Sequence, residues 1–351
     1  MKCYKYAFNI CIINNYGFFI ISSIMILYFI CLIIFLKKSF NKLLEDIAMI
    51  ISGLKNKIHN KNIYNKKIII KTTKKSSNNI LLINNKNLKQ KNDKKIDNSK
   101  KSILETNIND NKTKYEQKIL LYKDFEINLM NYKKALKLDK RSYTQYYISI
   151  LKNNHLLIFS FFPNKDFNSR IIKAFLFFFY FAVHFTINAL FFNDNTIHEI
   201  YQDKGNFNFI YQIPQIIYSS LISGIINILI KYLSSSRDSI VELKNSKEKN
   251  KNNLDIKHQE LLKSLKIKFF LFFILSFIIL LFCWYYITCF CGIYINTQLH
   301  LIKDSIISFA TSLIYPFAIY LLPGIFRIKA LHSKEHSLEY IYKLSLWLQM
   351  I

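Results

Sequence analysis

Five stretches of this chain are long enough and apolar enough to cross a lipid bilayer, and none of them contains Asp or Glu. They cover residues 16–36, 171–192, 207–230, 269–295 and 305–325. A spanning helix needs about 20 mainly apolar residues, and in hydrocarbon an isolated segment satisfies its backbone hydrogen bonds only as a helix. The sequence therefore predicts an all-α polytopic membrane protein with about five transmembrane helices, accompanied by interfacial amphipathic helices.

The residues between these stretches are strongly basic. The 351 residues include 49 Lys and Arg against 22 Asp and Glu, which gives a formal net charge of +27. Such a charge suits nucleic acid or an anionic membrane surface. The codons of Lys, Asn and Ile are rich in A and T, so an AT-biased genome would also raise the content of these residues, and the added Lys would contribute to the charge. Because the apolar residues are collected in blocks, the membrane explanation is favoured and no nucleic-acid partner is expected.

Basic residues are distributed unevenly among the connecting segments. Residues 37–170 contain 30 Lys and Arg, 231–268 contain ten and 326–351 contain four, whereas 193–206 and 296–304 contain one each. Positively charged connectors stay on the cytosolic side during insertion. We therefore expect the three basic segments in the cytosol, and the N-terminus and the two base-poor connectors on the other side.

The first stretch, 16–36, could instead be a secretory signal peptide. Its apolar run is longer than the usual core of about 7–15 residues. No small-residue cleavage site is evident, and Lys37 and Lys38 are typical of a segment that stops transfer. We expect a retained span, whose loss would leave a core of four spans unaffected.

Three units follow from this pattern. Residues 1–38 hold the N-terminal transmembrane helix, 39–140 form a basic, Lys- and Asn-rich low-complexity cytosolic tether, and 141–351 form a four-helix membrane domain. The tether cannot bury enough apolar surface to offset chain entropy, so we expect it to be largely disordered or loosely helical, and attracted to anionic lipid headgroups. Within the membrane domain, 231–268 is expected to be a cytosolic helical loop that runs into the fourth span.

Two further segments are predicted to lie as helices on the membrane surface. Residues 142–163 contain two apolar halves that are too short to span, with tyrosines such as Tyr143 and Tyr146 that suit the headgroup layer. The C-terminal segment is predicted to be an amphipathic helix. The apolar residues on one face of that helix are Leu338, Ile341, Leu344 and Leu348.

Polar side chains inside the spans are the first candidates for function. His184 and Asn188 share one face of the second span, and Asn227 belongs to a stripe of small and polar residues in the third. Such residues let helices approach closely and form hydrogen bonds between them, which is the favoured interpretation. A conduction or substrate path is the alternative. The lack of a carboxylate in the five stretches argues against proton- or cation-coupled transport.

We identify no catalytic, cofactor-binding or metal-binding residue, and expect no cofactor. The chain lacks the motifs of phosphate-binding loops, nucleophile elbows, zinc proteases and dinucleotide-binding folds. His198, Glu199 and Asp203 could hold a metal ion, but a cluster of this kind in a polar connector is usually only solvated. The six cysteines lie in or beside apolar stretches and are predicted to be buried thiols.

Three segments resemble a membrane region that recurs in uncharacterised multi-pass proteins of protists, ciliates among them. These segments are HLLIFSFFPNKDFNSRIIKAFLFFF, NALFFNDNTIHEIYQDKGNFNFIYQIPQIIYSSLISGIINILIKYLS and NTQLHLIKDSIISFATSLIYPFAIYLLPGIFRIKAL. The resemblance covers residues from about 141 to 351. It implies four spans and a shared fold, but no activity and no functional residue.

These observations favour a non-enzymatic membrane scaffold or anchor. Its expected partners are the lipid bilayer, anionic headgroups that the basic tether attracts, and a membrane-protein partner or a second copy of the chain. The alternative is a channel or transporter subunit in which His184, Asn188 and Asn227 face a polar path. A lipid-modifying enzyme is the least favoured class, because no nucleophile, carboxylate pair or metal set lies near the interface.

Overall fold

The computed structural model describes residues 14–56, 58, 122–164, 166–192, 198, 209–245, 251–333 and 338–349, and the structural statements below concern these residues. Their secondary structure is helical, with no strand in the described ranges. Five helices are long and apolar enough to cross a membrane, which confirms the predicted all-α polytopic class. They cover Tyr16–Asn56, Arg170–Leu190, Gln212–Ser234, Lys251–Ile293 and Gln298–His332.

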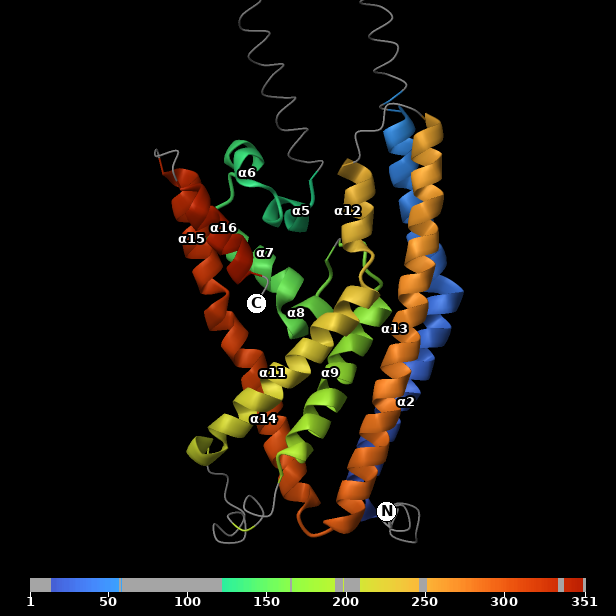
Figure 1. Cartoon of the computed structure of the whole chain (residues 1–351), viewed down its shortest axis with the longest axis vertical. Coiled ribbons are helices and arrows are strands. Elements are labelled where there is room, and N and C mark those ends of the chain that lie inside the picture. The colour runs from blue at the N-terminus through green and yellow to red at the C-terminus, as the bar shows by residue number, and fades with distance from the viewer. Residues whose placement is uncertain are drawn as a thin grey trace, which may run out of the picture.

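The five long helices consist of the following elements. The first is α2 (Tyr16–Ile34), continued by the π-helical turn η2 (Phe35–Ser39) and further helix to Asn56. The others are α9 (Arg170–Leu190), α11 (Phe209–Ser234), α13 (Lys251–Ile293), and α14 (Gln298–Ile319) followed by α15 (Leu321–His332). They run in alternating directions, so the basic segments meet at one end of the bundle and the base-poor connectors at the other (Figure 1).

The end that holds the basic segments also carries the short helices, and we call it the capped end (top of Figure 1). The short helices are α5 (Asp124–Asn128), α6 (Tyr132–Leu138), α7 (Tyr143–Asn154), α8 (Leu156–Phe161), α12 (Arg237–Asn245) and α16 (Glu339–Leu348). Central to the bundle is α9, which packs against α2, α8, α11, α13 and α14. Large apolar side chains of the surrounding helices, Ile225, Phe270 and Ile314 among them, are exposed on the perimeter, where lipid would cover them.

Helix α2 is part of this bundle and lies along α13 (Figure 1). Asn15 caps α2 and its Nδ2 also donates to the carbonyl of Thr288, 2.8 Å away, while the Tyr28 hydroxyl donates to the carbonyl of Phe273 at 2.9 Å. Apolar residues of α2, α9 and α13 belong to one core. The structure therefore joins the first span to the other four, where the sequence suggested a separate four-span domain.

At both ends of the predicted 39–140 tether, the described residues form packed helices. Residues 40–56 are helical, because Leu43, Ile47 and Ile51 recur at helical spacing and pack in the same core as residues of α13. At the other end, residues 124–138 form α5 and α6, which pack at the capped end. Residues 59–121, the middle of the predicted tether, lie outside the described residues.

The two predicted surface helices exist, but their buried faces differ from the prediction. Residues 142–163 form the pair α7 and α8. Tyr146, expected at the headgroups, is fully buried and donates a hydrogen bond to Gln349 Oε1 at 3.2 Å. On α16 the buried residues are Tyr342 and Ser345, whereas Leu344 and Leu348 are only half-buried, so the leucine face is not the face that packs most closely. Specific hydrogen bonds to α15 and α5–α6, which no periodicity reveals, set this orientation.

Candidate functional site

His184 lies at the centre of the bundle, on α9, and is fully buried. Its Nδ1 lies 3.2 Å from Oγ of Ser223 on α11, and its Nε2 lies 2.9 Å from Oγ of Ser308 on α14. Ser223 donates its own proton to the carbonyl of Ser219, so it accepts from Nδ1–H. Nε2 then accepts from Ser308, and a neutral imidazole satisfies the whole set.

Asn188 lies one turn further along α9 and is also buried. Its Nδ2 donates to Oγ of Ser305 at 2.9 Å, and its Oδ1 accepts from Gln215 Nε2 at 2.9 Å and from Ser219 Oγ at 3.2 Å. As with His184, the partners come from α11 and α14. The structure therefore brings together polar residues of the second, third and fifth spans in a set of hydrogen bonds between helices.

A buried carboxylate extends this set of hydrogen bonds toward the end of the bundle opposite the capped end. Asp304 accepts a 3.0 Å hydrogen bond from Gln212 Nε2, and both side chains are buried. The sequence placed Asp304 in the 296–304 connector, but α14 begins at Gln298 and includes it. The argument from the absence of carboxylates in the spans is therefore wrong for the fifth helix, because its helical turns extend beyond the purely apolar stretch.

Asn227, the third candidate, does not join His184 and Asn188. Its buried Oδ1 has no hydrogen-bond partner in the described part of the chain. It lines a cavity of about 350 Å³ at the capped end, together with Lys173 and Lys231. Lys173 lies near the start of its span, a position from which a lysine is expected to snorkel toward the interface. The structure instead buries it, with its Nζ 2.9 Å from Oδ1 of Asp166.

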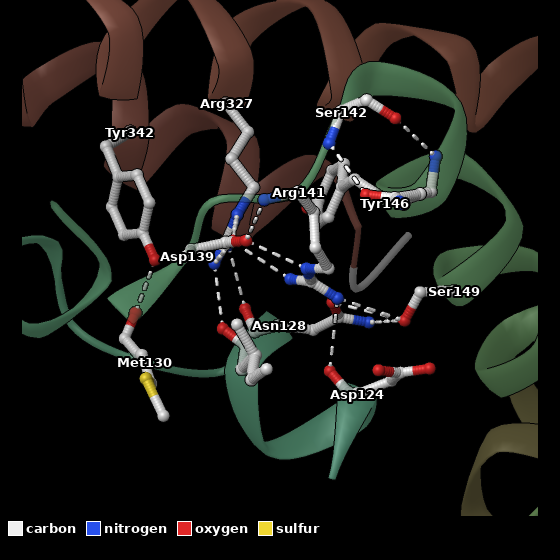
Figure 2. A network of polar contacts seen from close by, with 12 residues as sticks. Asp124, Asn128, Met130, Asp139, Arg141, Ser142, Tyr146, Ser149, Arg327 and Tyr342 are labelled. Atoms are coloured by element: carbon white, nitrogen blue, oxygen red, sulfur yellow. Dashed lines mark hydrogen bonds and ion pairs between the residues drawn. The ribbon is translucent and has the colours of Figure 1, made fainter. Parts of the chain in front are cut away.

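A second polar network, which no sequence pattern predicted, lies at the capped end (Figure 2). Arg327 of α15 is fully buried. Its Nε donates to Oδ2 of Asp139 at 2.9 Å, its Nη1 to the carbonyl of Asn128 at 3.0 Å and its Nη2 to the carbonyl of Ile127 at 2.8 Å. The planar guanidinium group thereby joins α15 to the segment that carries α5 and α6.

Aromatic rings and a second arginine complete the surroundings of this ion pair. The Arg327 guanidinium lies 4.7 Å from the ring centroid of Tyr146 and 4.8 Å from that of Tyr342. Arg141 donates to both carboxylate oxygens of Asp139, at 2.8 and 2.9 Å (Figure 2). Burial alone would raise the pKa of Asp139, but the hydrogen bonds and charges of Arg141 and Arg327 outweigh it and hold this pKa below its ordinary value.

This network holds residues 122–142, the segment that precedes α7, in place. The hydroxyl of Tyr342 donates to the carbonyl of Met130 at 2.6 Å, and Lys244 of α12 forms a 2.9 Å ion pair with Glu126 of α5. The pKa of Tyr342 is raised to about 12, mainly by burial. This hydroxyl therefore keeps its proton and donates throughout the physiological range. Residues 122–142 are therefore held at the capped end from several sides.

Other predicted features have the following outcomes. Cys31, Cys283, Cys289 and Cys291 are free and buried, as expected, whereas Cys3 and Cys11 lie outside the described residues. Of the three candidate metal ligands His198, Glu199 and Asp203, the last two also lie outside the described residues. Among the described residues no group of three His, Cys, Asp or Glu side chains has the arrangement of a metal site.

The fold and the polar contacts define the class of this chain as an all-α multi-pass membrane protein with five membrane-length helices. Comparisons with models of protein families, with curated proteins and with solved structures found no match to the chain. The resemblance to a membrane region of protist proteins therefore stays a prediction.

Proposed function

We propose that this protein is a non-enzymatic membrane anchor that holds the basic segment 59–121 by both of its ends at one face of the membrane. The observation that carries this proposal is the position of the two attachments. Before the segment, the first long helix packs along α13, with Lys55 Nζ 2.6 Å from Asp255 Oδ1. After it, the Arg327–Asp139 pair holds the chain to α15. Both attachments lie at the capped end (Figure 1).

The charge of the held segment supports this role. Residues 59–121 contain 16 Lys and five Asp and Glu. Near an anionic membrane surface each basic residue contributes about 1 kcal/mol of attraction. The uneven distribution of basic residues favours the cytosol for the capped end. The held segment would then act on anionic lipid headgroups, on a membrane-protein partner, or on a second copy of this chain.

The interior of the bundle also favours anchoring over transport. His184 and Asn188 use their hydrogen-bonding groups on neighbouring helices, and both are almost without exposed surface. Hydrogen bonds between helices of this kind stabilise helix packing in membranes. A path for ions or solutes would instead need groups that face water.

A channel or transporter subunit is the second candidate, and one observation favours it. Polar groups follow α14 from Asp304 through Ser305 and Ser308 to Ser312, which lines the cavity at the capped end. A buried carboxylate at one end of such a row is typical of proton-linked transporters. Flux measurements on reconstituted protein separate the candidates: proton or ion flux that Asp304→Asn abolishes would favour this second function.

Deletion of residues 59–121 tests the anchoring function, because it leaves both packed ends of the segment in place. A second variant keeps the length of the segment but replaces its lysines with glutamine. We expect both variants to insert and fold, and to lose normal localisation and the recovery of partners or anionic lipids. If both variants keep the localisation and partners of the unaltered protein, the anchoring function is wrong.

A further inference from the structure

The cavity at the capped end lies between the bundle and the α7–α8 pair. Its volume is about 350 Å³, and its lining includes residues of α5, α7, α8, α9, α11, α12 and α14. The exposed lining residues include Ile228 and Tyr232 of α11 and Tyr315 of α14, so the cavity reaches the apolar surface of the bundle at these two helices. Lys231 lies in the last turn of α11, near the end of a membrane-length helix. This is the depth at which lipid headgroups lie.

Among the described residues, four charged side chains line the cavity, and three of them have partners of opposite charge. Lys173 pairs with Asp166, and Arg237 pairs with Asp238 at 3.2 Å. Lys231 has no carboxylate within ion-pair distance among the described residues. Its Nζ lies 4.4 Å from the ring centroid of Phe159 and donates a long hydrogen bond of 3.4 Å to the carbonyl of Asn153. The cavity therefore presents one cation without an ion-pair partner of its own among the described residues; Asp166, which pairs with Lys173, acts on Lys231 only from beyond ion-pair distance.

Two hydrogen-bond acceptors in the same lining also lack partners. His155 is 1% exposed, and its Nε2 lies 2.7 Å from the carbonyl of Leu313, so Nε2 carries the proton. Its Nδ1 has no hydrogen-bond partner in the described part of the chain, and neither has the buried Oδ1 of Asn227. Burial lowers the pKa of His155, which favours the neutral ring and leaves Nδ1 as an acceptor. Buried polar atoms without partners are rare in folded proteins and call for a ligand or ordered water.

We propose that this cavity binds a phosphate-bearing molecule whose other groups donate hydrogen bonds. The phosphate lies against Nζ of Lys231, and hydroxyl or ammonium groups donate to Nδ1 of His155 and Oδ1 of Asn227. The headgroups of phosphatidylethanolamine and phosphatidylglycerol have this chemistry, as do small water-soluble sugar or glycerol phosphates. Phosphatidylcholine has the phosphate but no donor. The inference does not depend on the anchoring function, because it uses no residue of segment 59–121.

Lipid titrations of the purified full chain, followed by native mass spectrometry, test the proposal. Phosphatidylethanolamine and phosphatidylcholine with identical acyl chains have the same net charge and differ in hydrogen-bond donors. We expect the ethanolamine lipid to bind more tightly. Asn227→Leu should abolish this preference, and Lys231→Met should weaken both lipids about tenfold, which is the loss expected for a hydrogen bond from a charged group.

Lys268→Met is the matched control. Lys268 also lies at the edge of an apolar stretch, where α13 passes from its charged turns into residues 269–295. It donates to a backbone carbonyl (Ser235, 3.0 Å) and lies 4.4 Å from an aromatic ring centroid, that of Tyr232, but it does not line the cavity. We expect this variant to bind both lipids as the unaltered protein does. Equal losses in Lys231→Met and Lys268→Met would overturn the proposal, as would equal binding of the two lipids by the unaltered protein.

Glycerol phosphate in the same titrations identifies the source of the ligand. If millimolar glycerol phosphate displaces the ethanolamine lipid and itself depends on Lys231, the site takes a water-soluble phosphate. If it does not compete, the acyl chains contribute and the ligand is a membrane lipid. Both results support the site, whereas glycerol phosphate that binds the Lys231→Met variant equally well counts against it.

Discussion

Arg327 and Asp139 form a buried ion pair across 188 residues of sequence, with Nε of the arginine 2.9 Å from Oδ2 of the aspartate. The pair joins the end of the fifth long helix to the segment that follows the basic region. Removal of one partner from such a pair leaves an uncompensated buried charge. The pair therefore stabilises the position of residues 122–142 at the capped end, and with it the anchoring arrangement.

Substitution of either partner should separate the capped end from the bundle. We expect Asp139→Asn and Arg327→Met to lower the free energy of unfolding by about 3 kcal/mol each, with a much smaller loss for the second substitution when both are combined. Lys343→Ala removes the exposed pair with Glu339 and should cost less than about 0.5 kcal/mol. Denaturant unfolding of the purified variants measures these values. Equal effects for the buried and exposed pairs would contradict the structure.

Acid should release the same network. Because the pKa of Asp139 is lower in the folded protein than in the unfolded chain, the unfolded chain binds this proton more tightly. The stabilisation is complete above the ordinary aspartate pKa of about 3.9 and disappears as the pH falls through the lowered folded-state pKa. Fluorescence of Trp347 on α16, in a Trp284→Phe background, reports this change. The transition should be absent in Asp139→Asn, and a transition that is identical in both proteins would assign it to other groups.

The three polar candidates inside the spans, two on α9 and one on α11, should contribute to stability in a definite order. Asn188→Leu removes hydrogen bonds to three side chains and should cost most, about 1–2 kcal/mol, and His184→Leu about 1 kcal/mol. Asn227→Leu removes an Oδ1 without a partner and should cost least. Thermal unfolding in detergent gives the order. If Asn227→Leu is the most destabilising of the three, the hydrogen bonds of the bundle are assigned wrongly.

Close packing of α2 against α13 predicts opposite effects for two glycines. A Cβ at Gly17 would lie 2.6 Å from Sγ of Cys291, whereas a Cβ at Gly224 would have no atom within 4 Å. Gly17→Ala should therefore lower the melting temperature, and Gly224→Ala should leave it unchanged or raise it, since alanine favours helix by roughly 0.5–1 kcal/mol. If Gly17→Ala is neutral as well, the first span does not pack in the bundle as described.

The lengths of the apolar stretches predicted most of the fold. The five spans follow from apolar stretches of about 20 residues, and the charged stalk before the fourth span is continuous with it in α13. The sequence also placed His184 and Asn188 on one face of their helix, because helical spacing alone determines which residues share a face; that Ser223, Ser305 and Ser308 contact this face is seen only in the structure. These features depend on local periodicity, which is visible in a single sequence.

The capped end could not be predicted in the same way. Arg327 and Asp139 lie in segments that look like ordinary basic and polar sequence, and only the tertiary structure brings them together. Likewise, α16 turns Tyr342 rather than Leu344 to the interior, because the Tyr342 hydroxyl reaches the carbonyl of Met130. Asp304 was missed for a related reason. Helix α14 begins before the apolar stretch 305–325 and so includes Asp304, whose carboxylate accepts a hydrogen bond from Gln212.

Thiol labelling from each side of the membrane tests the central claim most directly, that both ends of segment 59–121 are held at the cytosolic face. Single cysteines at Ser52, Lys133 and His198, on a cysteine-free background, occupy exposed positions at the two attachments and in the base-poor connector. We expect probes at 52 and 133 to react only from the cytosol and the probe at 198 only from the opposite side. A probe at 52 or 133 that reacts from the side opposite the cytosol, or one at 198 that reacts from the cytosol, would contradict the account.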